Sequence, residues 1–256
     1  MAADPWADLT AELDAWAAAG RAASFWWRDD DATAPSPALD RLLGRAEACG
    51  VPLALAVIPA TAGPALGDRL ATAPAGIRVL VHGWSHGNHA RPDKKKSELA
   101  CGRPMAEMTA DLARGRARLD ELFGPRLLPV LTPPWNRLPV PLIRELPAIG
   151  INGLSRFKPR KTRSPAPGVV EVNTHIDPID WHGGRGFTGE VAALGAITAH
   201  LAARRTGRAD PTEPTGLLTH HLVHDQALDG FLDRLMAHFA AHPAVTWPDL
   251  QTVFAA

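Results

Sequence analysis

Residues 25–31 read Phe-Trp-Trp-Arg-Asp-Asp-Asp, an apolar run that ends in three consecutive carboxylates. A run of large apolar side chains is typical of a strand that is buried on both faces. Adjacent carboxylates repel one another, so their proximity costs free energy unless a cation compensates for it. One aspartate can cap the helix that follows, but a cap leaves the other two unexplained. We therefore predict a cation site at the end of this strand.

A second apolar run, residues 77–81, is followed by the sequence His82-Gly-Trp-Ser-His86. Two histidines at this spacing can face one metal ion from a helical turn or a tight loop. If both runs are parallel strands, their carboxyl ends lie at the edge of the sheet where active sites form. Two histidines and one aspartate leave coordination positions open, which is typical of a catalytic metal site rather than a structural one.

Strand and helix patterns alternate along the whole chain. We expect strands over residues 25–27, 53–58, 77–81, 127–131, 151–154, 169–173, 216–219 and 245–247. Helices are expected over residues 5–20, 37–48, 64–71, 103–122, 139–149, 191–205 and 227–240. Such alternation predicts a parallel sheet. At 256 residues it favours one α/β domain, spanning residues 1–256, with a (β/α) barrel of about seven to eight strands and an N-terminal helix, within residues 1–20, packed on it.

Composition excludes several classes of protein. Hydrophobic residues make up 46% of the chain, enough for a full core, and 27 basic residues balance 27 acidic ones. We therefore expect neither nucleic acid nor an anionic membrane as the main partner. No apolar run reaches the roughly 20 residues of a membrane span, and the N-terminus lacks the apolar core of a signal peptide. The two cysteines, Cys49 and Cys101, are expected to be free thiols, and the protein to be soluble and cytoplasmic.

Polar residues also follow the other predicted strands. They are Thr132-Pro-Pro-Trp-Asn136, Asp177-Pro-Ile-Asp180-Trp181, His175, His220 and His221. Polar groups at the ends of five strands are hard to explain by packing alone. We expect these segments to share one active-site edge.

In chain order these segments resemble the motifs of the polysaccharide deacetylase superfamily, also called the family 4 carbohydrate esterases. The first motif is an Asp-Asp pair after a strand, which implies Asp30 as the catalytic base and Asp31 as a metal ligand, with Asp29 in reserve. The second is His-(Ser/Thr)-x-x-His, which implies His82 and His86 as ligands. Glycine here replaces the hydroxyl residue.

The third motif is Arg-x-Pro-(aromatic)-Gly, and residues 132–136 resemble its frame without the arginine. In the family that arginine orients the base, and the backbone N–H of the aromatic residue stabilises the oxyanion. The resemblance implies the Trp135 N–H for the second role and leaves two candidates for the missing arginine, Arg28 and Arg137.

The fourth motif, Asp-x-x-Asp-Trp, matches residues 177–181 and adds Asp180 to the catalytic set. The fifth, Leu-x-His, implies His220 as the acid, with His221 as an alternative because side-chain parity at a strand end is uncertain. The family fold is a distorted (β/α) barrel of about seven strands. This agrees with the strand count from the pattern.

The resemblance implies a metal-dependent hydrolase of C–N bonds that removes an N-acetyl group from a sugar or glycan precursor. Zinc suits the ligands best, and cobalt, nickel, manganese and iron also fit them. Side chains expected to contact substrate are Trp84, Trp181, Arg137, Asp29 and His221.

Basic residues at 94–96 and 156–163 form either solvated loops or a rim for an anionic substrate. Two other functions stay open. One is a superfamily amidase that opens a small amide or cyclic imide, which a cytoplasmic location favours. The other is a non-catalytic carbohydrate-binding relative, supported only by the missing arginine. The sequence does not predict the oligomeric state.

Overall fold

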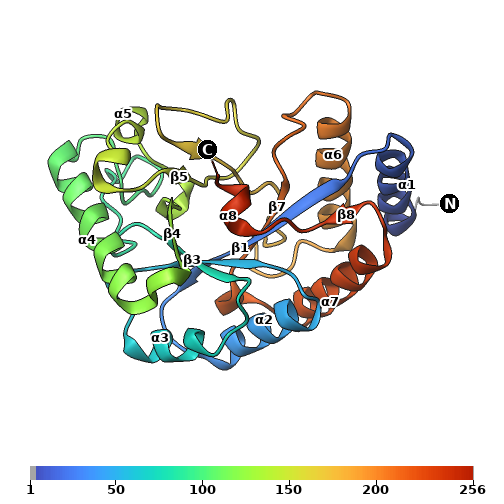
Figure 1. Cartoon of the computed structure of the whole chain (residues 1–256), viewed down its shortest axis with the longest axis horizontal. Helices are drawn as coiled ribbons and strands as arrows, with labels where there is room; N and C mark the ends of the chain where they lie inside the picture. The colour runs from blue at the N-terminus through green and yellow to red at the C-terminus, as the bar shows by residue number, and fades with distance from the viewer. Residues whose placement is uncertain (1–3, 256) are drawn as a thin grey trace.

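The computed structural model describes residues 4–255, in which strands and helices alternate along the chain (Figure 1). The strands are β1 (Ala23–Ala32), β2 (Leu53–Val57), β3 (Ile77–Val81), β4 (Leu127–Leu131), β5 (Gly153–Leu154), β6 (Val170–Glu171), β7 (Thr215–Thr219) and β8 (Val245–Thr246). The helices are α1 (Pro5–Ala18), α2 (Pro37–Ala48), α3 (Pro64–Ala71), α4 (Met105–Phe123), α5 (Val140–Ile143), α6 (Glu190–Arg205), α7 (Gln226–Ala241) and α8 (Leu250–Val253). Residues 1–3 and 256 of the predicted domain lie outside the described residues.

Within residues 4–255, seven strands form one parallel sheet in the order β6-β5-β4-β3-β2-β1-β7, and β8 pairs with the start of β1. The sheet curls into a half-barrel, and one bridge between Ile176 and Leu217 links the segment after β6 to β7. The larger helices surround the strands (Figure 1). The predicted barrel of parallel strands is therefore confirmed.

Two hydrophobic clusters follow from the alternation of side chains along β1. Phe25 and Trp27 point toward the helices and join the large outer core. Trp26 points the other way, into a smaller inner cluster with Ala56 and Leu80, which Leu250 of α8 also joins. Because side chains two residues apart share one face, Arg28 and Asp30 continue the inner side of this strand. The inner face thus changes from apolar to charged at the carboxyl end of β1.

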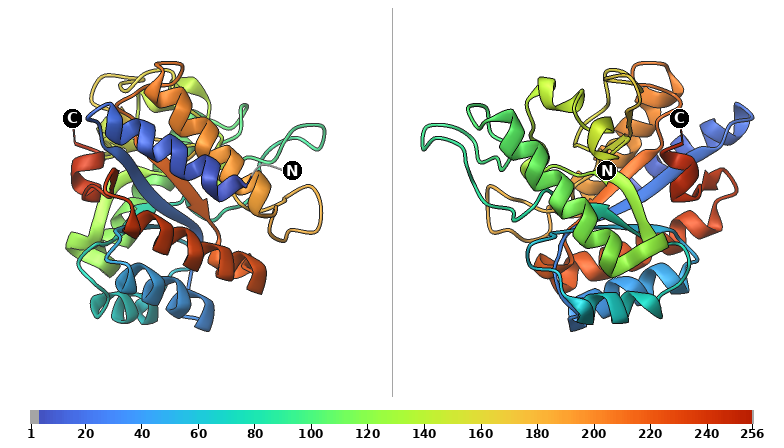
Figure 2. Two further views of the ribbon diagram at one scale, coloured as in Figure 1. Left: turned by 90° about the vertical axis from the view of Figure 1, so that its right-hand side faces the viewer. Right: turned by 60° about the vertical axis from the view of Figure 1, so that its left-hand side comes forward.

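Helix α1 buries Leu9, Leu13 and Trp16 in the outer core and lies alongside α6 (Figure 2). The predicted N-terminal helix is present, although it ends at Ala18. No helix among the described residues is long and apolar enough to cross a membrane. Both cysteines are free.

The segment between β4 and β5 differs from its prediction. The sequence predicts one helix over residues 139–149, whereas the structure has the short helix α5 and then a 3₁₀ turn, Pro147–Ile149. Pro147 has no N–H to donate to the carbonyl oxygen four residues earlier, so the hydrogen-bond ladder of a regular helix is interrupted at this point. β5 and β6 are also shorter than predicted.

Candidate metal centre and active site

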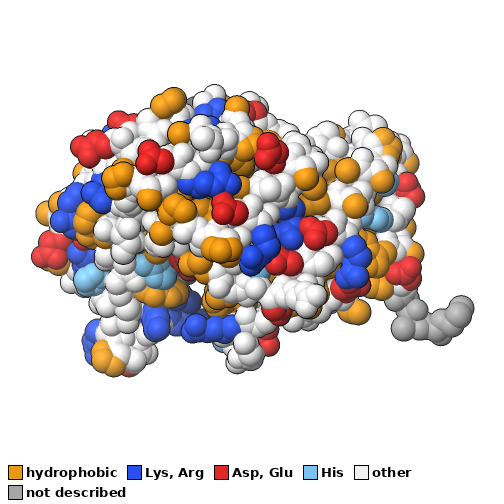
Figure 3. All heavy atoms as spheres, turned by 90° about the horizontal axis from the view of Figure 1, so that it is seen from below, with side chains coloured by type: hydrophobic (Ala, Val, Ile, Leu, Met, Phe, Trp, Pro, Cys, Tyr) orange, Lys and Arg blue, Asp and Glu red, His pale blue; other side chains and the backbone are white. Residues whose placement is uncertain are grey.

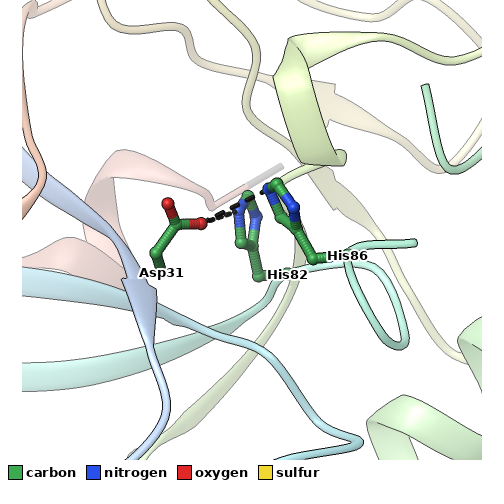
Figure 4. Close-up of side chains that lie close together, drawn as sticks. All are labelled: Asp31, His82 and His86. Atoms are coloured by element: carbon green, nitrogen blue, oxygen red, sulfur yellow. Dashed lines mark hydrogen bonds and ion pairs between the residues drawn. The ribbon is translucent and has the colours of Figure 1, made fainter. Parts of the chain in front are cut away.

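Asp31, His82 and His86 converge at the carboxyl ends of β1 and β3 (Figure 4). The Asp31 Oδ1 atom lies 3.1 Å from His82 Nε2 and 3.4 Å from His86 Nε2. One ligand atom from each residue lies within 4.8 Å of the other two. These are the three residues that the sequence predicts as metal ligands.

A β-bulge places two consecutive aspartates at this edge. Asp29 pairs with Leu55 and Ala32 with Val57, so Asp30 and Asp31 together oppose Ala56 of β2. Consecutive side chains of a regular strand point to opposite faces, and an extra residue breaks that alternation. Asp31 has a φ of 72°, a left-handed conformation that is uncommon outside glycine. The bulge therefore turns Asp31 toward the histidines while Asp30 keeps its inner position.

His82 is oriented as a metal ligand requires. Its Nδ1 atom lies 2.9 Å from the Thr132 carbonyl oxygen, which can only accept, so Nδ1 carries the proton and donates it. In the neutral ring the lone pair of Nε2 is thus on the side of Asp31, where a ligating histidine would meet a cation, whereas in the protonated ring Nε2 donates to Asp31. These three donor groups fit a divalent cation.

The pKa values of the three groups reflect their proximity. Burial disfavours the charged form of each. For His82 this effect is outweighed by the hydrogen bond to Asp31 and by the charges of Asp30 and Asp31, which raise its pKa. For His86 burial dominates, helped by the charge of His82, and lowers the pKa. Burial alone would raise the pKa of Asp31, but the hydrogen bond and charge of His82, then His220 and His86, hold it well below its usual range.

Arg28 and Asp30 form a buried ion pair beside this cluster. The Arg28 Nε atom lies 2.8 Å from Asp30 Oδ1, and Nη2 donates to Oδ2 at 3.0 Å. Nη2 also donates to Asn136 Oδ1 at 2.9 Å, and Nη1 donates to Ser155 Oγ at 2.7 Å. Of the two candidates for the missing motif arginine, Arg28 is therefore the one that holds Asp30.

Arg137 is exposed and donates to the backbone oxygen of Lys96. It lies three residues beyond Pro134, on the outer side of the turn that carries Trp135. The structure thus gives it a contact with the loop after His86 and none with Asp30.

The turn after β4 presents Trp135 to the cluster. Trp135 and Asn136 both have positive φ values, 55° and 58°. The Trp135 ring packs against His86 with 4.3 Å between ring centroids. Its N–H donates to no acceptor found among residues 4–255, which leaves it free to face a ligand. Strained backbone at several neighbouring residues is typical of functional sites.

His220 directly follows β7. Its charge acts on the pKa of both Asp31 and Asp177. The Trp181 ring lies edge-on to it at 4.7 Å, and Trp181 Nε1 donates to Asp177 Oδ2 at 2.7 Å. Burial raises the pKa of Asp177, against the charge of His220. Asp177, Trp181 and His220 therefore form one group.

Asp180 lies apart from this group. Its exposed carboxylate accepts the backbone N–H groups of His182 and Gly183, and so caps the turn in which it lies. The fourth motif thus contributes Asp177 to the neighbourhood of His220, whereas the sequence analysis selected Asp180.

Asp29 and His221 pair with each other on the outer face of the sheet. Asp29 Oδ1 lies 2.5 Å from His221 Nδ1, and Oδ2 accepts from the His221 backbone N–H and from the Thr219 hydroxyl. Both side chains are buried. Their mutual contact separates them from the substrate-binding role that the sequence analysis gave them, and it distinguishes His221 from His220.

Other predicted residues lie in varied surroundings. Trp84 is half-buried, and the Arg114 guanidinium covers its ring at 3.7 Å. Lys94, Lys95 and Lys96 are exposed in the loop after β3. Arg160 is buried and bonded to Asp210 and Thr212, so it is not part of a basic rim.

Loops after β3 and after β6 extend from the same end of the barrel (Figure 2). A space-filling view shows a recess between two protruding lobes at the lower edge of the molecule, with Lys and Arg side chains beside it (Figure 3).

Sequence reasoning missed Glu98 and Asn136. Glu98 is buried and accepts backbone N–H groups of the His82–His86 segment, and Asn136 accepts from Arg28. A glutamate next to three exposed lysines reads as one more solvated charge, so no local pattern marks it. Asn136 occupies the glycine position of the third motif, and asparagine is among the few residues that tolerate its left-handed backbone. That tolerance was a usable signal.

No protein-family model matches this sequence, and no curated protein matches it. Its structure is similar to that of a Mycobacterium smegmatis protein assigned to the polysaccharide deacetylases, with 18% identity, coverage of 91% of this chain and 89% of the other, and a TM-score of 0.64. It is also similar to a family 4 acetyl xylan esterase from Clostridium thermocellum in complex with a cobalt ion, with 15% identity, coverage of 90% and 89%, and a TM-score of 0.54.

A third similar structure is a peptidoglycan N-acetylglucosamine deacetylase, with 16% identity, coverage of 94% of this chain and 95% of the other, and a TM-score of 0.55. At these identities the likeness establishes the fold. The chain has the fold of the polysaccharide deacetylases and family 4 carbohydrate esterases, the fold that the motif resemblance implied.

Proposed function

We propose that this protein is a metal-dependent hydrolase that removes the N-acetyl group from an acetylated sugar or glycan precursor. One observation carries the proposal: Asp31, His82 and His86 converge beside Asp30, a buried carboxylate that Arg28 holds through both oxygens. A ligand triad with open positions and an oriented base beside it are the two components that hydrolysis by activated water requires. They lie at the carboxyl ends of parallel strands, the edge at which active sites form in α/β folds.

Asp31, His82 and His86 would hold the cation, and zinc suits two imidazoles and a carboxylate. A divalent cation bound there supplies a Lewis acid that polarises the acyl carbonyl and makes water more acidic. Asp30 takes a proton from the attacking water, and Arg28 keeps the Asp30 oxygens aimed at it. Asp29 is committed to His221, which removes it as an alternative base.

Trp135 and His220 perform the two remaining roles, oxyanion stabilisation and proton donation. The Trp135 N–H donates a hydrogen bond to the oxygen that becomes negative as water adds to the carbonyl. His220 gives its proton to the amine nitrogen as the C–N bond breaks, which yields acetate and the free amine. Asp177, in place of Asp180, accepts the indole N–H of Trp181, whose ring lies against His220 and offers a flat apolar face for the sugar.

The decisive experiment measures acetate release by the zinc-loaded protein from N-acetylglucosamine oligomers and an O-acetylated xylan, and ring opening of small cyclic imides. Release from the N-acetyl sugars, absent in Asp30→Asn protein that retains its zinc, supports the proposal. Turnover of the imides alone would assign the site to a small-molecule amidase. A zinc-loaded protein that binds the sugars and hydrolyses none of these substrates would be a carbohydrate-binding relative.

A further inference from the structure

The loop that carries both histidine ligands lacks the hydroxyl residue of the family pattern and has Gly83 instead. Gly83 has a φ of 63°, and a Cβ atom added there would lie 2.1 Å from Glu98 Oε2 and 2.7 Å from Pro134 Cγ. The space of the motif side chain is therefore filled by the carboxylate of Glu98. Neither serine nor threonine would fit at position 83 without moving it.

Glu98 binds the loop from inside. Its Oε1 atom accepts the backbone N–H of Trp84 at 3.1 Å and that of Ser85 at 2.8 Å. Its Oε2 atom accepts the backbone N–H of His86 at 3.2 Å. Three successive N–H groups that converge on one anion form a nest, and hydrogen bonds to a carboxylate are stronger than those between neutral groups. The carboxylate is buried, so water does not compete for these donors.

The backbone of Glu98 is itself fixed to α4. Its carbonyl oxygen accepts from Arg103 Nη1 at 3.2 Å, and Arg103 pairs with Asp111 of α4 at 2.9 Å. The Arg103 side chain therefore links the backbone of Glu98 to α4.

The loop needs these hydrogen bonds from Glu98 because His86 has a φ of 58°. A left-handed conformation at a residue other than glycine persists only when its surroundings enforce it. In that conformation the His86 side chain reaches Asp31, with 3.4 Å between Nε2 and Oδ1.

We propose that Glu98 is a positioning residue of the metal centre. Its carboxylate occupies the space that the motif side chain would need, and it sets the position of His86 before a cation binds. This inference rests on the proposed function insofar as the Asp31, His82 and His86 cluster binds a metal. Glu98 is not itself a ligand, because both of its oxygens are occupied by backbone N–H groups.

The test is the affinity of the full-length protein for Co²⁺, measured by competition with a chelator and by the visible absorption of the bound ion. Glu98→Gln keeps the size of the side chain but replaces one acceptor oxygen with a donor. We expect its affinity to fall by about 10- to 100-fold, the usual effect of losing a partner that orients a ligand. Its absorption spectrum should change, because the His86 position changes. The control, Glu121→Gln, removes an exposed carboxylate of α4 and should bind as the wild type does.

Wild-type cobalt affinity and spectrum in Glu98→Gln would overturn the proposal. A second measurement does not depend on how that variant folds: in the metal-free wild type the amides of residues 84–86 should resist hydrogen exchange. Exchange as fast as in the exposed segment 91–95 would also overturn it. The proposed function fails separately. Absence of metal binding in the wild type would contradict both the proposed hydrolase function and the positioning role of Glu98. A wild type that binds cobalt but releases no acetate would contradict the hydrolase function alone.

Discussion

Arg28 grips Asp30 through both carboxylate oxygens from two residues earlier on the same strand. The spacing places both side chains on the inner face of β1, so the arginine that the third motif lacks is supplied by the first. Asn136, at the glycine position of the third motif, accepts a hydrogen bond from the same guanidinium. The two departures from the family pattern, an arginine in the first motif and an asparagine at the glycine position of the third, therefore contact each other.

Arg28→Lys should lower kcat by up to about 100-fold while the metal content stays unchanged. Lysine keeps the charge but presents a single point donor, so Asp30 loses its two-point alignment, and small misplacements of a catalytic group are costly. Steady-state kinetics with metal analysis checks this. Arg137→Lys, which alters the exposed alternative, is the matched control and should change little. Equal losses in both variants would contradict the assignment of Arg28.

Asp30→Asn should retain the metal and lose about 10²- to 10⁴-fold in kcat, because general-base catalysis contributes that much. The amide cannot take up a proton at neutral pH, although it still fills the space beside Arg28. Metal stoichiometry and initial rates of acetate release measure the two effects separately. Wild-type turnover in this variant would remove Asp30 from the role of base.

Asp177 and Asp180 should differ sharply on substitution. Asp177→Asn weakens the hydrogen bond that holds the Trp181 ring against His220, so we expect a lower kcat in steady-state measurements of acetate release. Asp180→Asn alters only a cap of an exposed turn and should leave kcat unchanged. The opposite ranking would restore the position that the sequence analysis selected.

Zinc should stabilise the folded protein. A ligand that binds only the folded state at 100 times its dissociation constant adds about 2.7 kcal/mol to the free energy of unfolding. Urea unfolding with and without zinc measures this gain. His82→Ala removes a ligand whose orientation Thr132 fixes, and it should abolish the gain. Equal zinc stabilisation of this variant would place the metal elsewhere.

His200 should make the fold sensitive to acid. Burial, then the charges of His175 and Arg204, lower its pKa from the ordinary 6.5 to about 2. Its Nδ1 contacts the Thr215 hydroxyl at 3.0 Å, and its ring stacks on His175 at 3.7 Å. Because the folded-state pKa lies below that of the unfolded chain, the unfolded state takes up the proton first. The stabilisation from neutral His200 is full above pH 6.5 and is lost as the pH falls below it.

The size of this effect follows from linkage. Between pH 7.5 and 5.5 the wild type should lose about 1.4 kcal/mol more stability than His200→Asn, since one proton is taken up by the unfolded chain over this range. The asparagine amide can keep a contact with Thr215 and does not titrate. Denaturant unfolding at both pH values gives the comparison. Identical losses in the two proteins would exclude His200 as the source.

The sequence predicted the sheet well, and the structure brings the three predicted ligand residues together, because both features depend on local patterns. Apolar runs such as 77–81 mark buried strands, and the spacing of His82 and His86 lies within one loop. The prediction was poorest between residues 139 and 149, where Pro147 interrupts a helix-like pattern. The sequence alone also could not distinguish Asp177 from Asp180, because both residues belong to one motif and only their contacts differ.

By itself the sequence determined the order of strands and helices, the edge at which the candidate site lies, and the three residues that could hold a metal. Only the tertiary structure decided which aspartate faces which partner, which arginine holds Asp30, and that Glu98 supports the histidine loop. The physical reason is the distance along the chain over which each kind of interaction acts. Periodicity and spacing express interactions between near neighbours, whereas Arg28 meets Asn136, and Asp29 meets His221, only after strands distant in the chain have paired.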